Sequence, residues 1–213
     1  DFPVEFDALG TVTPLATASV RAQVSGVLQQ VLYAEGQLVK RGQLLAVIDP
    51  RPFENALMQA SGQLQRDEAQ LDNARVIERR YRQLLAQDSI AQQEVDAQAA
   101  LVRQLEGTVN FDRAAVRSAK LNLEFSRITA PITGRIGLRT VDVGNLVGPS
   151  DTAGIVSITL VDPIDVVFAV PQDTVPAVRD ALSGGRALAV TAFDRARTAQ
   201  LATGRFLALD NLV

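Results

Sequence analysis

The sequence predicts an α+β fold of several domains and elongated form, in which a long helical hairpin interrupts a β structure. Residues 53–127 contain no proline and only two glycines, Gly62 and Gly107, and are rich in alanine, glutamine, leucine, arginine and glutamate, which favour helices. On both sides of this stretch, β-branched residues, glycines and short apolar alternations are typical of short strands and turns. This arrangement indicates that an inserted hairpin splits one β domain.

Apolar residues in the helical stretch recur every seven positions, which is the spacing of a coiled-coil seam. A break predicts helices at residues 57–87 and 92–125, with Asp88 and Ser89 offering turn and N-cap chemistry. Arms of ~34 residues would be ~50 Å long at 1.5 Å per residue. The alternative is an ordinary pair of helices packed against a core. The apolar seam positions are Leu57, Ala60, Leu64, Leu71, Ala74, Tyr81, Leu85, Val95, Val102, Leu105, Val109, Val116, Ala119 and Leu123, and the acidic ones are Asp67, Glu78 and Asp112.

The two β segments contain an internal repeat with an offset of 108 residues. Gly26 corresponds to Gly134, and Gly36 corresponds to Gly144. A half-motif of ~30 residues cannot bury a core alone, whereas two related halves can face each other. We expect Gly26 and Gly134 to lie where the backbone needs positive φ or a close approach. Chance matching of apolar residues is the alternative. The predicted shared core comprises Val24, Val39, Leu45 and Ile48 with Ile132, Val147, Ile155 and Val156.

The composition excludes several classes of chemistry. The 213 residues contain no histidine and no cysteine, which removes disulfides, Ser–His–Asp and Cys–His catalysis and the usual zinc, haem and iron–sulfur ligands. The net charge of −3 argues against nucleic-acid binding. The spacing of the aspartates fits no calcium loop, and no apolar run reaches the length that spans a bilayer. We expect no cofactor, no metal and no enzymatic activity, and the start at Asp1 suggests a processed chain.

The first half-motif resembles the biotinyl/lipoyl carrier domain. Residues 35–49, EGQLVKRGQLLAVID, fit that family's pattern of glutamate, glycine and spaced apolar residues. In the carriers, the following turn bears the lysine that takes the cofactor. Here residues 50–52 are Pro-Arg-Pro, and the only lysines, Lys40 and Lys120, lie elsewhere. The resemblance therefore implies a lipoyl-like β-sandwich without covalent cofactor attachment, and the hairpin replaces the lysine turn.

A lipoyl fold split by a helical hairpin resembles the periplasmic adaptors, or membrane fusion proteins, of tripartite efflux pumps. Further matching segments are SRITAPITGRIG at residues 126–137, VDVGN at 141–145 and DPIDVVF at 162–168. The last of these, with residues 205–211, resembles most the MdtA subgroup of the AcrA/MexA-type family, which serves resistance-nodulation-division (RND) pumps. The implied domains are an incomplete β-barrel (residues 1–15 and 161–213), a lipoyl domain (16–50 and 127–160) and an α-helical hairpin (51–126), with the membrane-proximal domain outside this chain.

This resemblance implies an adaptor that links an inner-membrane RND drug/proton antiporter to a TolC-type outer-membrane channel. It also implies self-association, with six copies per pump, in the periplasm of a Gram-negative bacterium, anchored to or associated with the inner membrane. No nucleic acid partner is expected. Two alternatives are an adaptor of an ABC-type exporter or type I secretion system, and a biotin/lipoyl carrier domain, which the missing lysine opposes.

The resemblance also assigns a contact site for the outer-membrane channel to the hairpin tip. Relatives carry an arginine, a leucine four residues later and a serine seven residues after that. Arg80 and Leu84 match the first two positions, whereas Ala91 occupies the third and Ser89 lies two residues earlier. We expect Arg80 to donate hydrogen bonds to the channel and Leu84 to pack against it. The alternative is that Arg80 is a solvated helix residue and Leu84 belongs to the seam.

Overall fold

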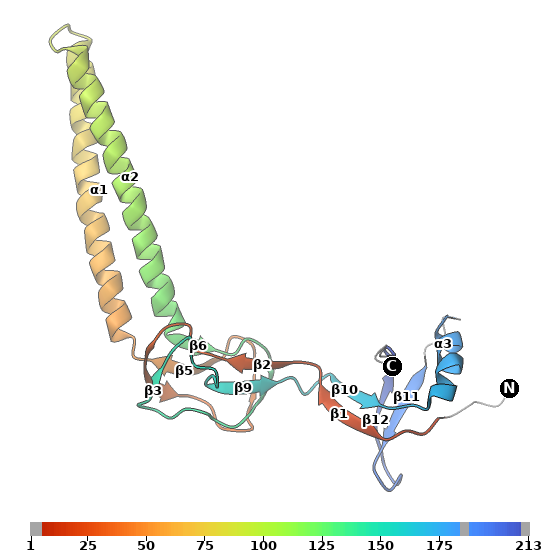
Figure 1. The fold of residues 1–213 in the computed structure, drawn as a ribbon. Helices are drawn as coiled ribbons and strands as arrows, with labels where there is room; N and C mark the ends of the chain where they lie inside the picture. Colours follow the sequence, from red (N-terminus) through yellow and green to blue (C-terminus); the bar gives the residue numbers. More distant parts are fainter. Residues whose placement is uncertain (1–5, 184–187, 210–213) are drawn as a thin grey trace. The chain divides into compact units, whose positions relative to one another are not determined.

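The computed structural model describes residues 6–183 and 188–209, and it divides into two compact units (Figure 1). One unit is Pro14–Ile164, and the other combines Asp1–Thr13 with Asp165–Val213. Within the described residues, no helix combines the length and the apolar character needed to cross a membrane.

The unit Pro14–Ile164 contains the predicted hairpin, with α1 at Arg51–Leu85 and α2 at Gln92–Phe125 (Figure 1). The bounds predicted for α2 are confirmed, whereas those predicted for α1 are wrong at both ends. α1 begins at Arg51 because Pro52 lies in its first turn, where the missing N–H of proline costs no hydrogen bond. It ends at Leu85, two positions before the predicted end.

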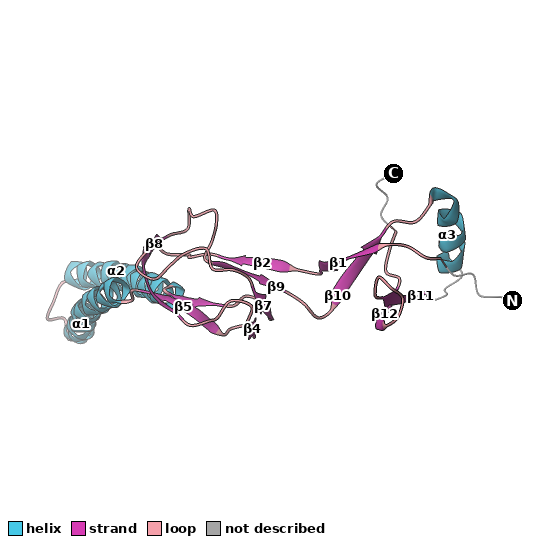
Figure 2. Cartoon of the chain, turned by 90° about the horizontal axis from the view of Figure 1, so that it is seen from below, coloured by secondary structure: helices cyan, strands magenta, loops and turns pink. Residues whose placement is uncertain are grey.

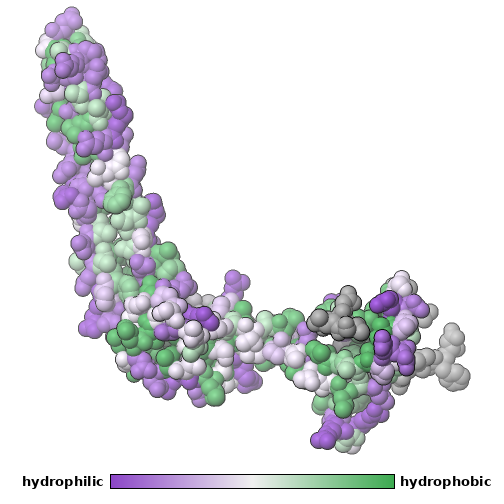
Figure 3. Space-filling view, viewed as in Figure 1, coloured by the Kyte–Doolittle hydropathy of each residue, from purple (hydrophilic) through white to green (hydrophobic). Residues whose placement is uncertain are grey.

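The two helices meet along the predicted heptad positions. Leu71, Ala74, Val102 and Val109 form a buried apolar cluster, against which Leu64 and Leu105 pack. On the face shown in Figure 3, hydrophilic residues cover much of the outer surface of the hairpin. The hairpin thus buries one narrow face of each helix. The other predicted seam residues are buried or half-buried as well: Leu57, Ala60, Tyr81, Leu85, Val95, Val116, Ala119, Leu123, Asp67, Glu78 and Asp112.

Polar contacts between the helices establish an antiparallel arrangement. Residues 74 and 75 of α1 contact residues 98 and 106 of α2, whereas the earlier residue 68 of α1 contacts the later residue 113 of α2. The contacts are Gln98 Nε2 to the Ala74 carbonyl oxygen at 3.0 Å, Arg75 Nη2 to Glu106 Oε1 at 2.7 Å and Arg113 Nη2 to Glu68 Oε1 at 2.8 Å.

Two four-stranded sheets lie at the base of the hairpin, and each takes strands from both sides of the insertion (Figure 2). One sheet has the order β2-β9-β7-β4, and the other has the order β6-β5-β3-β8. Their bounds are Thr17–Val20 (β2), Val156–Thr159 (β9), Gly134–Ile136 (β7), Leu38–Val39 (β4), Arg127–Thr129 (β6), Leu44–Ile48 (β5), Gly26–Val31 (β3) and Leu146–Val147 (β8).

The internal repeat appears as a matching order of strands in the two sheets. The repeat relates β2, β9, β7 and β4 to β6, β5, β3 and β8, so that equivalent strands take equivalent places. Equivalent backbone hydrogen bonds also recur. The Gly36 N–H donates to the Ile136 carbonyl at 3.0 Å, and the Gly144 N–H donates to the Leu28 carbonyl at 2.8 Å. The two half-motifs therefore complete each other reciprocally.

The shared core predicted from the repeat is confirmed. Of its eight predicted members, seven are buried in one cluster and Ile132 packs against that cluster half-buried. Phe53 and Phe125, from the start of α1 and the end of α2, also pack against it, which ties the hairpin base to the sheets. The buried apolar residues of the cluster are Val20, Ala22, Val24, Leu28, Val39, Leu45, Ala46, Ile48, Ile128, Ala130, Ile136, Val147, Ile155, Val156 and Ile158.

The second unit contains two short sheets and a helix among its described residues. β1 (Gly10–Pro14) pairs with β10 (Ile164–Phe168), and β11 (Ala189–Phe193) pairs antiparallel with β12 (Gln200–Arg205). A 3₁₀ turn at Gln172–Thr174 precedes α3 (Val175–Ser183). The rings of Phe168 and Phe206 meet edge to face at 6.3 Å. Of the segment 205–211 used in the family resemblance, Asp210 and Asn211 lie outside the described residues.

Candidate functional site at the hairpin tip

The tip is a tight loop at residues 86–91 that closes on the last turn of α1. The Leu84 carbonyl accepts hydrogen bonds from the N–H groups of Gln87 at 3.1 Å and Ser89 at 2.9 Å. Asp88 has a φ of 55°, in the left-handed region that aspartate tolerates better than most residues. These backbone bonds hold the loop in a defined form.

The expected N-cap from Asp88 or Ser89 is wrong. The N-cap of α2 is Ala91, in an extended conformation and without a side-chain cap hydrogen bond. Asp88 takes the left-handed turn position, and the Ser89 hydroxyl donates to the Gln87 carbonyl at 3.1 Å. Because the loop closes on α1, both polar side chains lie in the turn and not at the start of α2.

The structure brings the four predicted contact residues to this end of the hairpin. Arg80 and Leu84 lie four residues apart in the last part of α1, hence on one helix face. The side chains of Arg80, Ser89 and Ala91 are exposed, and Leu84 is half-buried. The Ser89 hydroxyl donates its proton within the loop, and Ala91 has no hydroxyl, so the serine expected from the family resemblance has no direct equivalent here.

The guanidinium of Arg80 is available for an external partner. Within the described residues, no carboxylate lies in ion-pair distance of it. By contrast, Arg82 is held by Glu78 at 2.7 Å in an i, i+4 pair. Arg79 is also exposed, so two cationic groups project from adjacent positions of α1.

Ile90, which is not among the predicted contact residues, is half-buried in the loop. A β-branched apolar residue in an otherwise polar turn was the available signal. Together with Leu84, it gives the tip an apolar component beside its arginines. The tip can therefore offer hydrogen-bond donors and apolar contact.

The repeat glycines lie where the backbone of the two sheets makes a close approach or a turn. A Cβ at Gly134 would lie 2.4 Å from the Thr159 carbonyl oxygen, and one at Gly26 would lie 2.5 Å from Ile48 Cγ2, so both allow close approach. Gly36 and Gly144, the second pair of the repeat, have φ values of 74° and 94° in turns. Each position thus has a backbone or packing reason for glycine.

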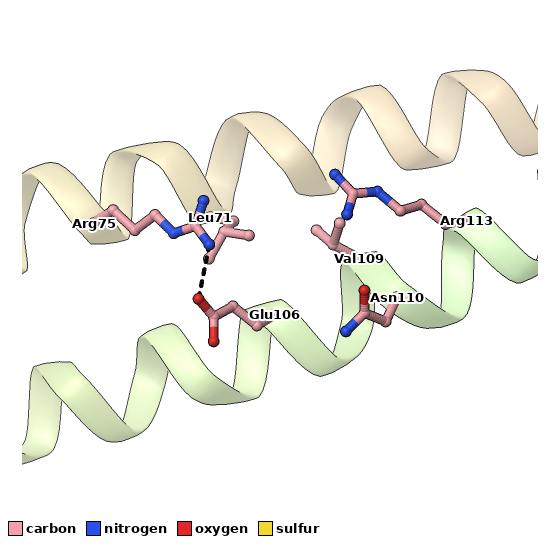
Figure 4. A pocket seen from close by; sticks show the side chains of 6 residues that line it. All are labelled: Leu71, Arg75, Glu106, Val109, Asn110 and Arg113. Carbon is pink, nitrogen blue, oxygen red and sulfur yellow. Dashed lines mark hydrogen bonds and ion pairs between the residues drawn. The ribbon is translucent and has the colours of Figure 1, made fainter.

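A shallow hollow of about 240 Å³ crosses the middle of the hairpin (Figure 4). Arg75 reaches across it to Glu106, and this ion pair raises the pKa of Arg75. The seam residues Leu71 and Val109 line its floor, and the charged residues Arg75, Glu106 and Arg113 lie around its edge. Since Arg75 bonds to Glu106 and Arg113 bonds to Glu68 across the helices, the hollow is better explained by interhelical packing than by ligand binding. Its lining residues are Leu71, Arg75, Glu106, Val109, Asn110 and Arg113.

A split pair of sheets with an inserted hairpin matches a described family. Residues 16–159 match the family described as RND MFP, barrel-sandwich hybrid domain, where MFP denotes membrane fusion protein. The chain belongs to the RND membrane fusion protein family. The matched range contains both four-stranded sheets and the whole hairpin.

Relatives of known name agree with this assignment. The multidrug resistance protein MdtA of Cronobacter turicensis is 49% identical over 211 residues, which is 99% of this chain and 51% of that protein. MdtA of Escherichia coli O139:H28 is 48% identical over 211 residues, which again is 99% of this chain and 51% of that protein. The chain thus spans about half the length of the curated relatives it matches.

Solved structures share the fold at low sequence identity. The membrane fusion protein Spr0693 of Streptococcus pneumoniae matches with a TM-score of 0.71 at 15% identity, over 97% of this chain and 84% of that one. A MacA–MexA chimera carrying the α-hairpin domain of Pseudomonas aeruginosa MexA matches with a TM-score of 0.62 at 23% identity, over 95% and 66%. These structural similarities show that the solved proteins share the fold of this chain.

Proposed function

We propose that this chain is the hairpin-bearing part of a periplasmic adaptor in a multidrug efflux pump. The adaptor would link an inner-membrane RND drug/proton antiporter to a TolC-type outer-membrane channel. Membership of the RND membrane fusion protein family and the identity of almost half to MdtA proteins support this function. The single observation that carries the docking role is that Arg80, which has no ion-pair partner among the described residues, lies four residues from a half-buried Leu84 at the hairpin tip.

The proposed domains follow the family pattern. Residues 16–50 and 127–160 form the lipoyl domain, residues 51–126 form a coiled-coil hairpin, and residues 1–15 with 161–213 form part of a β-barrel domain. The matched strand orders of the two sheets support the lipoyl assignment, and the seven-residue spacing of the buried seam supports the coiled coil. Residues 1–5, 184–187 and 210–213 of the barrel segment lie outside the described residues.

In this proposal the hairpin acts as a rigid spacer that presents its tip to the channel. A helix of the length of α1 is ~50 Å long, so the hairpin can carry its tip far from the sheets. Interhelical ion pairs and the apolar seam hold the arms together, and the backbone bonds of residues 86–91 fix the tip. Arg80 would donate to carbonyl or carboxylate oxygens of the channel while Leu84 packs against it. Ser89 and Ala91 would flank this contact.

The remaining parts of the proposal concern assembly and location. The adaptor would act in the periplasm of a Gram-negative bacterium, anchored to or associated with the inner membrane, and six copies would surround the conduit. It would catalyse no reaction and hold no cofactor, since its task is to join two membrane proteins. The absence of a lysine at residues 50–52 supports a lipoyl domain that carries no group.

The test is Arg80→Asp in the intact gene product, compared with Arg117→Asp, which reverses an exposed charge on α2 far from the tip. A charge change on an exposed helix surface usually alters folding by about 0.5 kcal/mol or less, whereas a central docking contact is worth roughly 2 kcal/mol, about thirtyfold in affinity. We expect Arg80→Asp cells to lose drug resistance at normal protein level, with crosslinking to the transporter retained. Arg117→Asp cells should stay resistant. Full resistance in the Arg80→Asp cells would contradict the docking role.

A further inference from the structure

Two carboxyl groups are buried where the hairpin seam should be apolar. Asp67 on α1 is 3% exposed and Asp112 on α2 is 5% exposed, as buried as the neighbouring Leu71. They lie across the two helices within hydrogen-bonding reach of each other. Two carboxylates in this position repel each other, and burial deprives both of water.

The two buried carboxyl groups differ in their hydrogen-bond partners. Asp67 accepts hydrogen bonds from Arg66 Nε at 2.8 Å and from Gln63 Nε2 at 2.9 Å. Asp112 lacks such partners, and its buried Oδ2 atom accepts no hydrogen bond from any residue that the structure describes. An orphaned, buried carboxylate oxygen opposite a second carboxylate marks a place for a proton.

The other charged groups beside the pair do not neutralise it. From α2, Arg113 follows Asp112 in sequence but bonds to Glu68 of α1, at 2.8 Å. From α1, Arg66 is the cation that faces both carboxyls, and its guanidinium is bonded to Asp67. One cation therefore faces two buried acids, which leaves one negative charge too many unless a proton is bound.

We propose that Asp67 and Asp112 share one bound proton, and that losing this proton loosens the two arms at this level of the hairpin. In the bound state, the protonated carboxyl of Asp112 donates to the carboxylate of Asp67, which also keeps its bonds to Arg66 and Gln63. The site makes the packing of the hairpin depend on pH. This inference rests on the seam alone and does not depend on the proposed function.

The sign of the pH dependence follows from the two groups. Burial, and then the hydrogen bond to Asp67, raise the pKa of Asp112 above 3.8, so its contribution is lost as the pH rises through that raised pKa. The hydrogen bond from Arg66 lowers the pKa of Asp67 below 3.8, so its contribution is lost as the pH falls through that lowered pKa. The seam is most stable between the two pKa values.

The direct test is carbon NMR of the aspartate carboxyls in the 213-residue chain, titrated from about pH 2 to pH 8, together with amide exchange at several pH values. We expect the two carboxyls to titrate in separate steps, one above and one below 3.8. The pKa of Asp112 should be higher in the packed hairpin than in the locally opened one. For each unit of that difference, residues 63–71 and 109–116 should open about tenfold more often at high pH than at low pH. Ordinary, independent titration of both groups would overturn the proposal.

Asp112→Asn provides the matched variant, since the amide copies the shape of the protonated carboxyl and can donate to Asp67. Its opening frequency should change less than about twofold over the range in which the wild-type chain changes tenfold or more. Asp72→Asn, an exposed site on α1, is the control and should keep the wild-type pH dependence. If Asp112→Asn keeps the wild-type pH dependence, the pair does not hold the proton. The wild-type titration decides the matter even if a variant folds poorly.

Discussion

Gly134→Ala tests the reciprocal packing of the two half-motifs. A Cβ at this position would lie 2.4 Å from the Thr159 carbonyl oxygen and 2.8 Å from its carbonyl carbon, closer than real Cβ contacts. Both atoms belong to the backbone of β9, which pairs with β7. Since neither can rotate away, the methyl group must push two paired strands apart in a sheet that also contains the Gly134–Val39 pair.

Overpacking of this kind costs about 1–3 kcal/mol. For a chain of this size, 1 kcal/mol corresponds to roughly 2–4 °C in melting temperature, so we expect a fall of about 2–12 °C. Thermal unfolding followed by circular dichroism measures the change. At the sheet residues, amide exchange should quicken in both halves of the repeat, because β7 and β9 contact strands from each.

Gly62→Ala is the matched control for this substitution. Gly62 lies in α1, and a Cβ there would meet no atom within 4 Å. Alanine is favoured over glycine in a helix interior by about 1 kcal/mol, so the control should be equally stable or more stable. If Gly134→Ala melts at or above the wild-type temperature, the close approach of β7 and β9 does not limit the fold, and the argument fails.

Other predictions address the core, the hairpin and the carrier alternative. Val39→Asp places a carboxyl at a fully buried position and should cost about 3 kcal/mol, so an unchanged melting temperature would refute the shared core. Val109→Ala should quicken amide exchange in both helices by removing the most buried seam side chain, and unchanged exchange would argue against the cluster. Arg75→Ala breaks the exposed pair with Glu106 and should cost less than about 1 kcal/mol in chemical denaturation; a larger loss would mean that the pair is structural. Co-expression with a biotin ligase should leave the intact mass unchanged, and an added biotin would support a carrier domain.

Much of the fold could be predicted because its two strongest signals are periodic. The seven-residue spacing gave the seam residues and the bounds of α2, and the repeat of 108 residues gave the shared core. The start of α1 could not be placed from apolar spacing, since Arg51 and Pro52 lie before the first seam residue. The order of strands in the sheets depends on pairing between distant segments, to which a single sequence gives no direct signal.

The candidate site was predictable only in part. Arg80 and Leu84 came from a family motif, whereas the loop geometry that fixes Asp88 and Ser89 depends on backbone bonds to α1. Asp67 and Asp112 were visible as acids on the seam, but their meeting depends on the register of two helices, which the heptad pattern does not determine.

The central claim is that the hairpin tip docks on an outer-membrane channel, and site-specific photocrosslinking in living cells tests it most directly. A photoreactive residue at Gln83, exposed beside Leu84, should crosslink to the channel, and adding Arg80→Asp should abolish that product. The same residue at Lys120, exposed near the base of α2, should give no channel product. A crosslink to the channel from Lys120 and none from Gln83, at equal protein level, would contradict the account.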